Sequence, residues 1–80
     1  MDNQVRANAR AKLQRMLPRY FWGSGSAIKI VVKNGNIILL GTVATKQDSD
    51  IASIQCGSVP FAFHVFNMLR VEPASEKAKN

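Results

Sequence analysis

The residue pair Asn34-Gly35 constrains the fold most, because it separates two runs of residues that favour β-strands. Asn and Gly accept the positive φ angles of a type I′ turn, whose twist matches that of two antiparallel strands. Before the pair, Ile28, Ile30 and Val32 alternate with Lys29, Val31 and Lys33. After it comes the run Ile37-Ile38-Leu39-Leu40-Gly41-Thr42-Val43. The sequence therefore predicts a β-hairpin within residues 27–43.

A helix is predicted before the hairpin, because residues 2–20 contain no Gly and reach their first Pro only at position 18. At 100° per residue, one apolar stripe collects Val5, Ala9, Leu13, Met16, Leu17 and Tyr20. Pro18 cannot continue the helical hydrogen bonds, so we expect the helix to kink or end near it.

A second helix, of about three turns, is predicted after the hairpin. Thr45 can cap its first turn, where Asp48 would place a carboxylate at the positive end of the helix dipole. Its short apolar stripe consists of Ile51, Ala52 and Ile54. Gly57 suits the position that follows a helix end.

Residues 61–71 alternate again and predict a third strand, parallel to the second because a crossover between strands is right-handed. The fold class is therefore α+β: a small αββαβ two-layer sandwich with a three-stranded mixed sheet and two helices on one face. We divide the single domain into a basic amphipathic helix with a Gly/Ser loop (1–27), a core (28–71) and a flexible tail (72–80).

The face of the sheet that points away from the helices is predicted to be apolar, which is unusual for a sheet covered on one side. We expect a homodimer or larger assembly to cover it. Alternatively, the first helix or the tail of the same chain covers this face, or another domain of a longer parent protein does. The predicted interface residues are Val31, Ile38, Leu40, Phe66 and Met68.

The net charge of +6 lies in the N-terminal part, where residues 1–33 hold seven bases and one acid, Asp2. A helix rimmed by bases and followed by aromatic residues suits the surface of an anionic membrane. Alternatively, the aromatic residues complete the core and the bases are solvated, or the chain is a scaffold without a ligand. A small nucleic-acid-binding module is the alternative from another class. The predicted lipid-binding residues are Arg6, Arg10, Lys12, Arg15, Arg19, Tyr20, Phe21 and Trp22.

Catalysis is not predicted, because the chain has one His, one Cys and five acids. Cys56 and His64 cannot supply the four ligands of a structural zinc site, and no third group would orient them as a nucleophile and base. Asp48 and Asp50 lie two residues apart and therefore on different sides of a helix. We expect no enzyme activity, metal, cofactor or small-molecule substrate. The longest apolar run, residues 37–40, is too short to span a bilayer.

The pattern of residues 28–71 resembles the BON domain of bacterial osmotic-stress and nodulation proteins. The residues that carry the resemblance are Ile28-x-Ile30-x-Val32-x-Asn34-Gly35-x-Ile37-x-Leu39-x-Gly41-x-Val43, Asp50 and Ala52, Val59-Pro60, and Phe63-x-Val65-x-Asn67-x-Leu69-x-Val71. Phe61 departs from a usual Gly, and Ile38 and Leu40 depart from usual polar residues. The resemblance implies an α/β sandwich without catalysis, found mostly in the bacterial envelope or periplasm and in several members associated with phospholipid surfaces.

Overall fold

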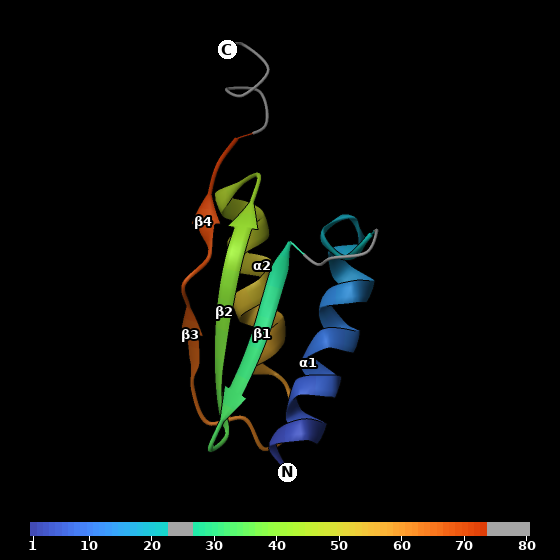
Figure 1. The fold of residues 1–80 in the computed structure, drawn as a ribbon, viewed down its shortest axis with the longest axis vertical. Helices are drawn as coiled ribbons and strands as arrows, with labels where there is room; N and C mark the ends of the chain where they lie inside the picture. Colours follow the sequence, from blue (N-terminus) through green and yellow to red (C-terminus); the bar gives the residue numbers. More distant parts are fainter. Residues whose placement is uncertain (23–26, 74–80) are drawn as a thin grey trace.

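The computed structural model describes residues 1–22 and 27–73, and Figure 1 shows how their helices and strands are arranged. The Gly/Ser loop and most of the predicted flexible tail lie outside the described residues. In chain order the elements are α1 (Asp2–Met16), η1 (Pro18–Phe21), β1 (Ile28–Lys33), β2 (Asn36–Val43), α2 (Lys46–Gly57), β3 (Val65–Asn67) and β4 (Arg70–Val71).

The sheet is mixed and has β2 at its centre. β1 pairs with β2 antiparallel, whereas β3 and β4 follow one another along the opposite side of β2 and pair with it in parallel. Both helices cover one face: α1 contacts β1 and α2, and α2 contacts β2, β3 and β4. The predicted small α+β sandwich, with two helices on one face of a mixed sheet, is confirmed.

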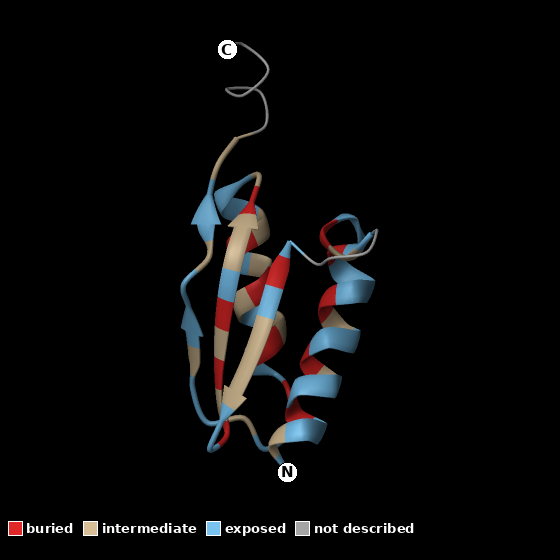
Figure 2. Cartoon of the chain, viewed as in Figure 1, coloured by how far each residue is buried: buried red, intermediate tan, exposed pale blue. Residues whose placement is uncertain are grey.

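The core lies between the sheet and the two helices. Figure 2 shows the buried residues along the sides of α1, α2 and the strands that face one another. Its most deeply buried large side chains are Val5, Leu13, Ile28, Ile37, Leu39, Val43 and Cys56.

The predicted two-residue turn is confirmed at Asn34-Gly35, where φ is 54° and 83° and Lys33 pairs with Asn36. The Asp2 carboxylate accepts hydrogen bonds from the amides of Asn34 (2.9 Å) and Gly35 (3.0 Å). This clamp ties the first turn of α1 to the hairpin turn.

The prediction of one continuous third strand is wrong, because Met68 and Leu69 separate β3 from β4. The register on β2 is the same on both sides of this junction, and the amide of Met68 still donates to the carbonyl of Leu39 at 2.9 Å. At the junction, Asn67 Oδ1 accepts from the amide of Leu69 (3.0 Å), and Asn67 Nδ2 donates to Ser49 Oγ on α2 (2.9 Å). Residues 61–64 also lie outside a strand, and Phe61 has a left-handed φ of 70°.

Three helix predictions are also wrong in detail. Met16 is exposed because α1 ends there, and Leu17 packs into the core instead. Ile54 is exposed because residues 49, 52 and 56 form the buried side of α2, and Ile54 lies on the opposite side of the helix. Gly57 is the last helical residue, followed by Ser58 as the cap. The predicted Thr45 cap is confirmed: its Oγ1 accepts from the Asp48 amide at 3.0 Å.

We expect Gly41→Ala to lower the free energy of unfolding by about 3 kcal/mol or more, measured by urea denaturation. Gly41 has a φ of 123°, and an added Cβ would lie 2.0 Å from the carbonyl oxygen of Ala27. Gly57→Ala is the matched control, because a Cβ there meets open space inside a helix and should stabilise it by up to about 1 kcal/mol. Equal effects of the two substitutions would contradict this reading of Gly41.

Candidate functional site

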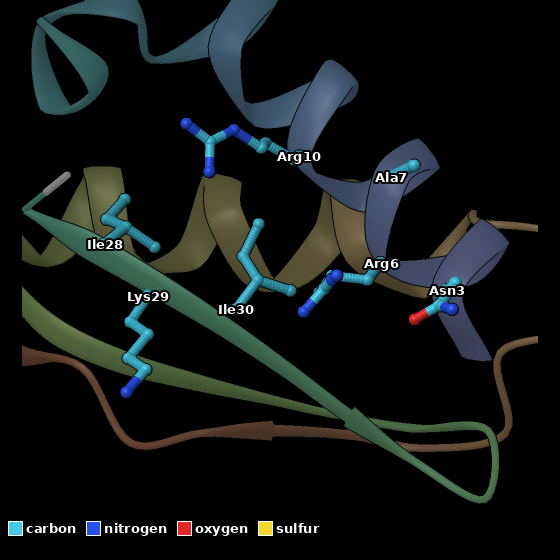
Figure 3. Close-up of a pocket in the computed structure, with 7 residues that line it drawn as sticks. All are labelled: Asn3, Arg6, Ala7, Arg10, Ile28, Lys29 and Ile30. Atoms are coloured by element: carbon cyan, nitrogen blue, oxygen red, sulfur yellow. The ribbon is translucent and has the colours of Figure 1, made fainter. Parts of the chain in front are cut away.

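A cavity of about 630 Å³ lies between α1 and the outer edge of the sheet at β1. Residues at spacings of three and four line one side of it, so a single face of α1 is involved. Figure 3 shows Arg6 and Arg10 reaching from α1 toward β1, while Lys29 extends from β1 in the other direction. The lining residues of this α1–β1 groove are Asn3, Arg6, Ala7, Arg10, Ile28, Lys29 and Ile30.

The groove combines positive charge with apolar surface. Arg6 and Arg10 are exposed, and within the described part of the chain no carboxylate lies within ion-pair distance of either. The Arg10 guanidinium lies 5.7 Å from the centre of the Phe21 ring, at the end of the groove near η1. None of the described residues that line the groove is an acid. Its electrostatics and shape therefore suit an anionic group attached to an apolar one.

Arg19 and Tyr20 belong to a separate network that joins η1 to the start of α2. Arg19 forms an ion pair with Asp48, and the Tyr20 hydroxyl donates to the same carboxylate. The Tyr20 oxygen also accepts from the amide of Ala44 at 2.8 Å. Tyr20 is only 8% exposed. The ring of Tyr20 thus completes the core and its hydroxyl is engaged, while its lipid contact stays a prediction.

The other predicted lipid-binding residues are spread over several surfaces. Phe21 is partly buried against the core, whereas Trp22 is exposed. Lys12 and Arg15 lie on α1 but do not line the groove. Of the predicted lipid-binding residues, the structure thus places Arg6 and Arg10 along the groove, with Arg10 near Phe21.

Sequence reasoning missed the part that β1 plays in the groove. Ile28, Lys29 and Ile30 line it only because β1 is the border strand and α1 packs beside it. A usable signal was present, since the first strand of the predicted hairpin had a pairing partner on one side only.

The predicted interface residues lie together on the sheet face opposite the helices. Val31 pairs with Ile38, and Ile38 pairs with Phe66. Val31 and Ile38 are partly buried, while Leu40, Phe66 and Met68 are exposed. α1 packs on the other face, so it is not the cover that this apolar face would need. Residues 74–80 of the tail, the other cover from within the chain, lie outside the described residues.

The described residues hold few groups suited to chemistry. Cys56 is buried, and loss of solvation raises the pKa of its thiol to about 11. Residues 1–22 and 27–73 contain no cluster of three or more metal-ligating side chains. In the same residues, every buried polar side-chain atom has a hydrogen-bond partner.

None of the helices in the described part of the chain is long and apolar enough to cross a membrane.

One known protein family matches almost the whole chain. The family model of the BON domain matches residues 4–73 and so confirms the resemblance seen in the sequence. The match includes α1 from its third residue onward and all the groove residues except Asn3. No curated protein matches the chain.

We expect Cys56 in the folded protein at pH 8 to react with an aromatic disulfide reagent at least 100-fold more slowly than in urea. A rise of the thiol pKa from 9.0 to about 11 lowers the thiolate fraction about 100-fold, and burial lowers the rate further. As a control, the variant Cys56→Ala, Ser58→Cys places a thiol at an exposed position and should react rapidly when folded. Fast reaction of native Cys56 would contradict its burial.

Proposed function

Because the chain belongs to the BON domain family, we propose that it is a non-catalytic module that binds anionic phospholipid in the α1–β1 groove. The supporting observation is that Arg6 and Arg10 face the groove and that no carboxylate of residues 1–22 or 27–73 forms an ion pair with them. Guanidinium groups form strong, directional hydrogen bonds with phosphate oxygens. Ile30, which is only partly buried, offers apolar contact for the part of a lipid next to its headgroup.

The expected affinity is modest. Each base near an anionic membrane contributes about 1 kcal/mol, so Arg6 and Arg10 together give about 2 kcal/mol. Exposed Trp22, which follows η1, adds an amphipathic ring suited to the headgroup region. Binding should weaken as salt screens the charges. Family resemblance supports a location in the bacterial envelope or periplasm for this activity.

We expect Arg6→Glu, Arg10→Glu to lower partition onto anionic vesicles about 30-fold or more, measured by flotation, because about 2 kcal/mol of attraction becomes repulsion. Lys12→Glu, Arg15→Glu is the matched control: it changes the net charge equally but leaves the groove residues intact. The control variant should lose less of its partition onto anionic vesicles than Arg6→Glu, Arg10→Glu does.

Three outcomes would count against this proposal. Equal losses in the two charge variants would indicate a diffuse positive surface instead of the groove. Equal binding of the wild type to neutral and anionic vesicles would exclude the electrostatic contribution. Tight binding to nucleic acid with a steep salt dependence would favour the alternative of a nucleic-acid-binding module.

Self-association is a second candidate activity, supported by the apolar sheet face. Complete burial of its five side chains would contribute about 8–15 kcal/mol, whereas association costs about 4–15 kcal/mol. Val31 and Ile38 are already partly buried, so the gain lies toward the lower value. By strand alternation Lys29, Lys33 and Arg70 share this face. A weak homodimer that is strengthened by salt is therefore expected.

We expect Leu40→Glu, Phe66→Ser to convert this homodimer into a monomer in sedimentation equilibrium, because a carboxylate and a hydroxyl would replace apolar contacts. Phe66 is 49% exposed, so the substitution should leave the core intact. Ile54→Ser, on the outer side of α2, is the control and should keep the wild-type mass. If the wild type and the double variant have the same mass in solution, this interface is excluded.

A further inference from the structure

An exposed apolar surface surrounds the hairpin turn, at the end of the molecule where α1 begins. We call it the aromatic tip and define it by Met1, Phe61, Ala62 and Phe63 around Asn34-Gly35. We propose that the aromatic tip inserts into the interface of the same anionic bilayer whose headgroups bind in the α1–β1 groove. The inference rests on the proposed function and adds an apolar anchor to it.

The two Phe rings are held out from the body of the protein. Phe61 is 72% exposed and Phe63 is 79% exposed. Phe61 has a φ of 70°, which is rare for a bulky residue and found where the surroundings impose it. The amide of Phe63 donates to the carbonyl of Gly35 at 2.8 Å, so the segment is fixed to the hairpin turn. Ordered backbone thus presents both rings to solvent.

The tip encloses an apolar cavity of about 420 Å³. Among the described residues that line it, Asp2 is the one acid, and both of its carboxylate oxygens accept hydrogen bonds from the turn amides of Asn34 and Gly35. Gly35 leaves room for the ring of Phe63, since an added Cβ would lie 2.7 Å from its Cδ2. The aromatic tip is therefore an apolar surface suited to contact with hydrocarbon.

Continuity with the groove favours a bilayer as the occupant. The first turns of α1 contribute to both surfaces: Met1 and Asp2 line the tip, and Asn3 and Arg6 line the groove. Lys33, exposed beside the turn, adds a cation at the same end. In a membrane interface the apolar rings would contact the acyl chains, and the bases beside them would contact the anionic headgroups.

Flotation with anionic vesicles distinguishes the contribution of the tip to binding from that of the groove. We expect Phe61→Asn, Phe63→Ser to bind more than about tenfold more weakly, and the loss should persist at high salt because it removes apolar contact. Asn accepts the left-handed φ at position 61, so the loop should keep its conformation. Ile54→Asn is the matched control: Ile54 is 69% exposed and lies on α2, outside both surfaces. Its binding should equal that of the wild type.

Fluorescence adds a test of insertion that does not depend on affinity. The single Trp of the chain, Trp22, directly follows η1 and so comes after the C-terminal end of α1, whereas the tip lies where α1 begins. In the variant Trp22→Phe, Phe63→Trp, we expect a blue shift on anionic vesicles and strong quenching by lipids brominated on their acyl chains. Trp22 of the wild type should be quenched less by the same lipids.

The results distinguish failure of the tip from failure of the groove. If the wild type binds vesicles and Phe61→Asn, Phe63→Ser binds equally well, the tip proposal is overturned while the groove proposal stands. A blue shift at position 63 that follows protein concentration without vesicles would indicate a protein contact and overturn the bilayer assignment. No vesicle binding by the wild type would overturn both.

Discussion

The register of β2 is the constraint on which the rest of the structure depends. β2 pairs with all three other strands, and Ile37, Leu39 and Val43 place the sheet's inner face against the helices. A slip of one residue would turn Ile38 and Leu40 toward the helices instead. Because those residues are also apolar, hydrophobic burial discriminates poorly between the two registers. The hairpin turn and Gly41 must make the distinction.

Each of these features fixes the register through backbone geometry. The Asn34-Gly35 turn sets the pairing of Lys33 with Asn36, and Asp2 holds the turn from outside the sheet. At the other end of β2, Gly41 allows the backbone of Ala27 to approach more closely than any side chain would permit. With the register fixed at both ends, the outer face is free to carry large apolar side chains that the fold itself does not need.

Local patterns in the sequence were sufficient for the element order and for both ends of the hairpin, because a turn type and a hydrophobic period act over a few residues. The break between β3 and β4 was not predictable in this way. At this junction Asn67 bonds to Ser49, a residue of another element, and the sequence pattern does not show that contact. Similarly, helical periodicity placed Tyr20 on the apolar stripe but could not show that Asp48 and Ala44 would engage its hydroxyl. The groove required the position of β1 at the sheet border, which is a property of the complete topology.

The two borders of the sheet are protected against pairing with another chain in different ways. On one side, β3 and β4 are short and interrupted, which offers little continuous backbone to an incoming strand. On the other, β1 runs unbroken for six residues, and its protection is electrostatic: Lys29 and Lys33 on the strand, Arg6 and Arg10 beside it. Bound polyanions would neutralise that protection. Conditions that crowd phosphate onto the protein are therefore the ones under which this border becomes a template for strand addition and aggregation.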